Sequence, residues 1–141
     1  MTSTALIIAA IVEGALATTD EPLGHWTNPA RSVTVEITRC ASSASALCGH
    51  VRWASDKAKA DARSAGTSEL VGVELMQDFV SRGRGRWRGR LFVPDLRTRS
   101  AAELRLIGFD RLKVTGCTAG KLLCRSQLWI RTSPQAPLVS S

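Results

Sequence analysis

Apolar and polar side chains alternate along several short segments of the chain, a pattern that predicts half-buried β-strands. In the clearest segment, 32–40, Val33, Val35 and Ile37 fall on one face, and threonine and glutamate fall on the other. Similar patterns predict strands at 24–27, 47–53, 69–79, 86–93, 100–107, 111–116 and 126–132. Segment 55–68 has no apolar stripe, so we expect a long connection that contains one helical turn. Eight short strands separated by turns predict an all-β fold, either an antiparallel sandwich or an up-and-down barrel.

The alternation also predicts an interior of medium-sized apolar side chains with two indole rings. The expected inward-facing residues are Val33, Val35, Ile37, Val51, Trp53, Val71, Val73, Leu75, Trp87, Leu91, Leu104, Leu106, Leu112, Val114, Leu128 and Ile130. An eight-stranded barrel is just wide enough to be filled by its own side chains or to hold one small ligand. If the interior is open, we expect a ligand pocket that includes Leu75 and Leu91, with Trp53 and Trp87 at or near its mouth. If it is filled, the same side chains form a packed core.

Four cysteines fall into two close pairs, Cys40 with Cys48 and Cys117 with Cys124. Each pair brackets a polar loop between two predicted strands, and neither pair has the spacing of a zinc knuckle. We expect two local disulfides, each closing a loop of about 8 residues and contributing roughly 2.5 kcal/mol to stability. Cross-pairing between the pairs, a metal site and buried free thiols are the alternatives. An even number of closely spaced cysteines is typical of proteins from an oxidising compartment.

The N-terminal segment gives a second indication of that compartment. Residues 5–17 are almost all apolar and end in Ala15-Leu16-Ala17, which matches a small-x-small cleavage site. The pattern predicts a signal peptide at 1–17 and a periplasmic or secreted protein. Glu13 interrupts the run and no Lys or Arg precedes it, so an ordinary apolar N-terminal helix is the alternative. We expect one barrel domain at 18–132 and a disordered tail at 133–141, which contains two prolines and three serines.

Charge adds a possible partner. The chain has 19 Lys and Arg against 12 Asp and Glu, a net charge of +7. Arg82, Arg84, Arg86, Arg88 and Arg90 recur at every second position, so an extended backbone would place all five on one face. Such a stripe could contact anionic lipid or polysaccharide, whereas the alternative is a solvated strand face that blocks edge-to-edge pairing. The export signals argue against nucleic acid as the partner.

The residues that usually carry catalysis are scattered. His25 and His50 are the only histidines, and no local Ser/His/Asp or Cys/His arrangement surrounds them. Neither histidine is placed to complete a metal site with the cysteines. We therefore expect no enzymatic activity, no metal and no cofactor.

Six motifs together resemble one bacterial family. They are Gly24-x-Trp26, Leu47-Cys48-Gly49-x-Val51-x-Trp53, Leu70-x-Gly72-x-Glu74-Leu75, and the segments Trp87 to Asp95, Leu104 to Cys117 and Leu123 to Arg131. The chain resembles the bacterial domain-of-unknown-function family 2147 over about 24–131. That resemblance implies an exported, lipocalin-like eight-stranded antiparallel β-barrel with no established enzymatic activity. Residues 55–64 and 96–100 depart from the family pattern, which bears on functions carried by loops more than on the fold.

Trp26 and Arg131 resemble the closure of a lipocalin barrel. In that arrangement a tryptophan of the first strand seals one end, and an arginine of the last strand lies across the ring as a cation–π pair. We expect this pair to be structural rather than part of a binding site.

Two functions follow from these expectations. The first is an exported barrel that binds an apolar or amphipathic small molecule in the cell envelope. The second is an envelope interaction or structural module with a filled barrel, which contacts anionic lipid or polysaccharide through its arginine-rich face.

Overall fold

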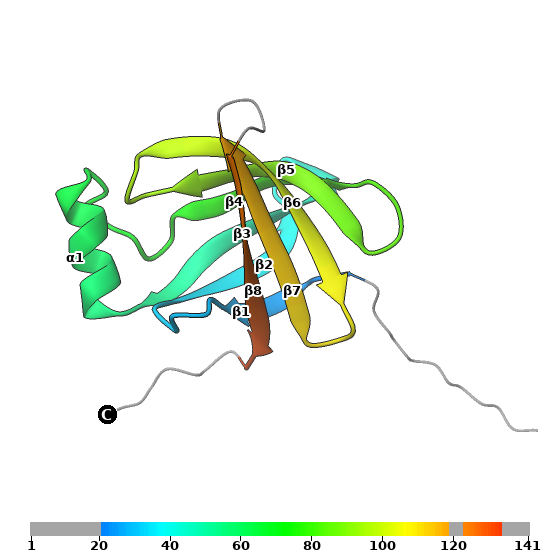
Figure 1. Ribbon diagram of the computed structural model, residues 1–141, viewed down its shortest axis with the longest axis horizontal. Coiled ribbons are helices and arrows are strands. Elements are labelled where there is room, and N and C mark those ends of the chain that lie inside the picture. The colour runs from blue at the N-terminus through cyan, green and yellow to red at the C-terminus, as the bar shows by residue number, and fades with distance from the viewer. Residues whose placement is uncertain (1–20, 119–122, 134–141) are drawn as a thin grey trace, which may run out of the picture.

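The computed structural model describes residues 21–118 and 123–133. The predicted signal peptide at 1–17 and residues 134–141 of the predicted tail lie outside the described residues. Eight antiparallel strands pair in chain order, and the last pairs with the first to close a barrel (Figure 1). The all-β prediction is confirmed, and of the two candidate architectures the barrel is present. No helix in the described ranges is long and apolar enough to cross a membrane.

The elements follow one another with short connections, except between β3 and β4. Their bounds are β1 (Gly24–Thr27), β2 (Val33–Cys40), β3 (Ser43–Ala54), α1 (Asp56–Ser64), β4 (Glu74–Ser81), β5 (Arg86–Val93), β6 (Thr98–Ile107), β7 (Arg111–Thr118) and β8 (Leu123–Thr132). The β1–β2 turn, α1, the β5–β6 turn and the adjoining ends of β7 and β8 gather at one end of the barrel. We call this the open end, and the opposite end the closed end.

The helix α1 is longer than the single turn that the sequence predicted. Its start is capped by Ser55, whose hydroxyl accepts a hydrogen bond from the Ala58 amide at 3.1 Å. Asp56 in the first turn and Arg63 in the last turn also suit the helix dipole. Ala62 is the one buried residue of the helix. Hydrophobic periodicity reports burial, so a helix that buries a single alanine leaves no stripe to detect.

Two strand boundaries also differ from the prediction. β4 begins at Glu74 rather than 69, and Val71, predicted to face inward, is 42% exposed. Gly72 has a φ of +100°, which a continuous strand does not accommodate. β3 begins at Ser43, inside the loop expected at 41–46, because only two residues turn the chain after β2.

The inward face of β8 is the reverse of the prediction. Opposed residues in an antiparallel pair share a face, and Leu112 and Val114 of β7, both buried, lie opposite Trp129 and Gln127. Trp129 is therefore inward, whereas Leu128 and Ile130 are outward and about 40% exposed (39% and 43%). A shift of one residue exchanges the faces of a strand, and β8 carries apolar residues in both phases.

The closed end is filled by a packed core. Trp26, Phe79, Met76, Leu104 and Leu112 are among its fully buried side chains. The Trp26 indole donates a hydrogen bond to the Pro22 carbonyl at 2.9 Å, which satisfies its polar atom within the core.

The predicted closure pair is present at this end. The Arg131 guanidinium carbon lies 4.4 Å from the centroid of the Trp26 ring and 4.5 Å from that of Phe109. Arg131 also donates hydrogen bonds to the carbonyls of Leu23 (2.6 Å) and Phe109 (2.8 Å). Partial burial lowers the pKa of Arg131, and the nearby Asp110 carboxylate opposes that shift. A Cβ at Gly24, whose φ is +118°, would lie 2.8 Å from Arg131 Nη1, so the closure requires glycine there.

Both local disulfides are confirmed, and the cross-pairing is excluded. Cys40–Cys48 lies at the closed end and packs with Ala46 in a small buried cluster. Cys117 and Cys124 lie directly opposite each other on β7 and β8 near the open end. Asp78 lies close to the first pair, but both sulfur atoms there are joined to each other, so the group does not provide thiolates for a metal. Two disulfides are typical of a protein that folds in an oxidising compartment outside the cytoplasm.

Candidate ligand cavity at the open end of the barrel

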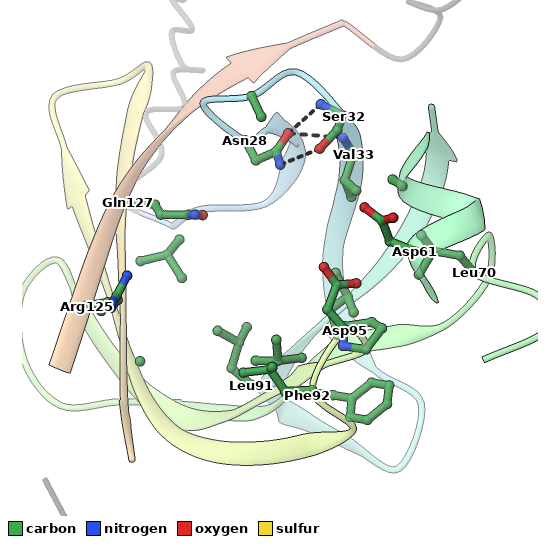
Figure 2. Close-up of a pocket in the computed structure, with 18 of the residues that line it drawn as sticks. Asn28, Ser32, Val33, Asp61, Leu70, Leu91, Phe92, Asp95, Arg125 and Gln127 are labelled. Atoms are coloured by element: carbon green, nitrogen blue, oxygen red, sulfur yellow. Dashed lines mark hydrogen bonds between the residues drawn. The ribbon is translucent and has the colours of Figure 1, made fainter. Parts of the chain in front are cut away.

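The open end contains a cavity of about 970 Å³, near the upper limit usual for small-molecule pockets. Its lining residues are Asn28, Ala30, Arg31, Ser32, Val33, Ser55, Lys57, Ala58, Asp61, Leu70, Leu75, Leu91, Phe92, Val93, Pro94, Asp95, Leu96, Ser100, Val114, Gly116, Thr118, Leu123, Arg125, Gln127 and Trp129. Figure 2 looks into this cavity, with side chains projecting from the surrounding ribbon. The barrel interior is therefore filled in one half and open in the other.

The floor of the cavity is apolar. Leu75, Val114 and Trp129 are buried and line it from three different strands, and Leu91 adds a fourth, half-buried side chain. Gly116 keeps space open above them, because a Cβ there would lie 3.3 Å from Ser100 Oγ and 3.5 Å from Leu91 Cδ2. The neighbours of Gly116 in the same row are Ala102 on β6 and Arg125 on β8.

The rim is held by a network centred on Asn28. Its amide oxygen accepts hydrogen bonds from the backbone amides of Ser32 (2.9 Å) and Val33 (3.0 Å), and its amide nitrogen donates to Ser32 Oγ at 2.9 Å (Figure 2). These bonds use the side chain of Asn28 to fix the β1–β2 turn. Asn28 is therefore a structural residue of the rim.

Gln127 and Trp129 are coupled on the wall formed by β8. The Trp129 indole donates a hydrogen bond to Gln127 Oε1 at 3.0 Å, which fixes the orientation of both side chains. The amide nitrogen of Gln127 has no protein acceptor within the described residues, so it is a donor that a ligand could use.

Charged groups lie on opposite sides of the cavity. Asp61 of α1 and Asp95 of the β5–β6 turn are on one side, and Arg125 is on the other (Figure 2). Lys57 Nζ forms an ion pair with Asp61 Oδ2 at 2.9 Å. The hydrogen bond and charge of Asp61 raise the pKa of Lys57, with a smaller contribution from Asp95. The two acids and the lysine therefore form one group at the rim, and Arg125 stands apart from it.

The structure separates the four residues that the sequence assigned to a ligand pocket. Leu75 and Leu91 line the cavity, but Trp53 and Trp87 do not. Trp87 is buried in the packed core. An irregularity in the β2–β3 pairing places Trp53 opposite Thr34. Thr34 lies between the inward-facing Val33 and Val35 and therefore faces outward. Trp53, as its pairing partner, also faces outward. The tryptophan that lines the cavity is Trp129, which sequence analysis placed on the outer face.

Arg125 and Gln127 also escaped the sequence analysis. Both lie on the same face of β8 as Trp129. The large indole ring of Trp129 was the one sequence feature that could have indicated that this face points inward. Neither histidine lines the cavity. His25 Nε2 lies 3.9 Å from Glu36 Oε1, and His50 Nε2 lies 3.8 Å from Glu74 Oε2.

The predicted arginine stripe is divided between a turn and a strand. Arg82 and Arg84 lie in the β4–β5 turn, and Arg86, Arg88 and Arg90 point outward from β5. Exposed cations on β6 and β7 continue this outward face. We call the combined surface of the three strands the cationic wall; it consists of Arg86, Arg88, Arg90, Arg99, Arg105, Arg111 and Lys113. Within the described part of the chain, the only acid paired with these positions is Glu103, which lies opposite Arg88, with its Oε2 3.8 Å from Arg86 Nε.

The family described as an uncharacterized protein conserved in bacteria, DUF2147, matches residues 24–131. The chain belongs to DUF2147. The matched part contains the whole closed barrel up to the closure residue Arg131.

A solved structure shares the fold of this DUF2147 chain. Protein HP1028 from the human pathogen Helicobacter pylori, described as belonging to the lipocalin family, superposes with a TM-score of 0.62 at 12% identity. The match covers 82% of this chain and 85% of that protein. The DUF2147 barrel is therefore lipocalin-like. No curated protein sequence matches the chain.

Proposed function

We propose that this DUF2147 protein binds a small apolar or amphipathic molecule in the open half of its barrel, and that it does so in the bacterial periplasm or outside the cell. The single observation that carries the proposal is the cavity of about 970 Å³ with an apolar floor. The disulfides support the compartment. The proposed activity is binding rather than catalysis, since neither histidine lines the cavity.

The apolar floor is sufficient to hold a ligand of modest affinity. Burial of roughly 300 Å² of apolar ligand surface contributes about 7 kcal/mol before the entropy lost on association is subtracted. Hydrogen bonds to groups such as the Gln127 amide would add specificity more than affinity. An association cost of at least about 4 kcal/mol leaves roughly 3 kcal/mol, so we expect dissociation constants on the order of millimolar from the apolar floor alone.

The test follows Trp129, the cavity tryptophan, by fluorescence. Purified protein is stripped of bound lipid and titrated with a panel of apolar and amphipathic compounds, and the untreated protein is examined by native mass spectrometry. We expect an emission change that persists in Trp53→Phe, because Trp53 lies outside the cavity, and disappears in Trp129→Phe. An empty native spectrum, together with no binding detected by calorimetry across the panel, would refute the proposal.

A second function is favoured by the cationic wall. Arg86, Arg105 and Lys113 lie directly opposite one another on three adjacent strands, and like charges in that position destabilise a sheet. Contact with an anionic surface would offset that repulsion. Leu128, opposite Lys113, and Ile130, opposite Arg111, are exposed beside these cations. Because apolar side chains beside cations suit a lipid headgroup layer, we propose an anionic membrane as the surface.

A further inference from the structure

Arg125 is the feature of the cavity that the binding proposal leaves unexplained. It extends from near the start of β8 on the inward face, opposite Gly116 and two positions from Gln127. Within the described residues, Arg125 has no ion pair and no side-chain hydrogen bond. The other arginine of this strand, Arg131, has two hydrogen bonds and two aromatic neighbours. An arginine that lines a cavity without a partner is available to a ligand.

The acids of the cavity do not supply that partner. Asp61 is bound to Lys57 at 2.9 Å, and Asp95 also acts on Lys57. Both acids lie across the cavity from Arg125 (Figure 2). One positive charge on the β8 wall is therefore unbalanced, while the negative charges at the opposite rim have a lysine beside them.

The surroundings of Arg125 leave room for a head group. Its neighbours along the row are Gly116 and then Ala102, two of the smallest side chains. Farther along β8, toward the closed end, come Gln127 and Trp129, and Val114 lies opposite Gln127. A ligand with its head at Arg125 would therefore direct its apolar part toward Val114 and Trp129.

We infer that the cavity selects an amphipathic carboxylic acid, with its carboxylate on Arg125 and its apolar chain on the floor. This inference rests on the proposed ligand binding and specifies the class of ligand. Guanidinium binds carboxylate through two parallel hydrogen bonds, and the amide nitrogen of Gln127 lies on the same wall as a further donor. Arg31, on the β1–β2 turn, also lines the cavity without an ion pair among the described residues, whereas Arg125 lies on the β8 wall beside Gln127 and is the cation that the head of a ligand on the apolar floor would meet.

The test compares three ligands that share one apolar chain: decanoic acid, decanol and decylamine. Binding to the full-length protein is measured at neutral pH by Trp129 fluorescence and by calorimetry. We expect decanoate to bind roughly tenfold or more tightly than decanol, because hydrogen bonds to charged groups contribute more than neutral ones. Decylamine should bind most weakly.

Variants then assign the preference to Arg125. Arg125→Gln should weaken decanoate binding about tenfold or more and leave decanol binding unchanged. Arg125→Lys should retain part of the preference, because it keeps the charge and loses the planar fork. Arg63→Gln, an exposed arginine of α1 that does not line the cavity, is the control for net charge and should behave as the unmodified protein.

The pH dependence provides an independent readout. Arginine stays charged throughout, so the preference for decanoate over decanol should be lost as the pH falls through the range of an ordinary carboxyl group, about 4 to 5. Circular dichroism at each pH verifies that the barrel remains folded.

The outcomes distinguish this inference from the binding proposal. Equal binding of decanoate and decanol, or an unchanged preference in Arg125→Gln, would overturn the role of Arg125 and leave the cavity as a binding site. Preference for decylamine would also overturn it and would point to Asp61 and Asp95. Failure of all three ligands, together with the wider panel, would instead remove ligand binding itself.

Discussion

Two arginines of β8 show how neighbours decide what one residue type does. Arg131 lies between the rings of Trp26 and Phe109 and is bound to two carbonyls, so its interactions are satisfied within the protein. Arg125, six positions earlier, faces the cavity and has no such partners in the described part of the chain. The first stabilises the closed end, and the second is available for recognition.

The structural role of Arg131 can be measured directly. Arg131→Gln removes two cation–π contacts and weakens two hydrogen bonds, so we expect a loss of about 2 kcal/mol in the free energy of unfolding, measured with urea. Arg52→Gln is a suitable control, because it breaks only the exposed ion pair with Glu36 and should cost less than about 1 kcal/mol. Equal effects of the two substitutions would contradict a special role for the closure.

At the scale of elements, β5, β6 and β7 combine their outward residues into one cationic surface. Each strand contributes cations at alternate positions, and the register brings them into shared rows. Arg99 has partners within the protein: its Nε donates a hydrogen bond to Gln77 Oε1 at 3.2 Å, and its guanidinium carbon lies 5.3 Å from the centroid of the Phe92 ring. The remaining cations of the wall have a single acid, Glu103, among the positions paired with them.

Binding to an anionic membrane tests this surface. We expect the protein to sediment with phosphatidylglycerol vesicles but not with phosphatidylcholine vesicles, and to be released by salt. Arg88→Gln with Arg105→Gln should weaken binding roughly tenfold or more, since each basic residue near such a surface contributes about 1 kcal/mol. Lys59→Gln with Arg63→Gln, on α1, removes the same net charge away from the wall. If both pairs weaken binding equally, or if the protein does not bind these vesicles, a specific membrane-binding wall is ruled out.

For the whole molecule, the main feature is the division of one barrel into a packed half and a hollow half. The closed end contains the large buried side chains, whereas the open end has small residues in the row of Ala102 and Gly116. The closed half provides the stability that lets the other half remain open. The open half also carries the cavity and its loops.

Paired truncations of leucine should reveal this division. Leu104→Ala, in the packed half, should cost about 2 to 5 kcal/mol of unfolding free energy, because it leaves a new cavity. Leu91→Ala, at the existing cavity, should cost on the order of 1 kcal/mol, because fewer contacts are lost. Chemical denaturation of both variants provides the comparison. A cost for Leu91→Ala as large as that for Leu104→Ala would mean that the open half is packed in solution.

The sequence by itself determined the all-β class, most of the strands, both disulfides and the closure of Trp26 by Arg131. These features leave local signals: strict alternation as in Val33, Val35 and Ile37, short cysteine spacing, and motifs that are shared with a family. Each signal depends on residues close together in the chain or on a recognisable pattern.

Tertiary structure alone decided where the cavity lies and which side chains enter it. The irregularity in β3 turned Trp53 outward, and pairing with β7 selected the phase that brings Arg125 and Trp129 inward. The helix α1 forms through a cap and charges, without an apolar stripe. Cavity volume depends on how side chains from many strands meet in space, and no local pattern along the chain carries that information.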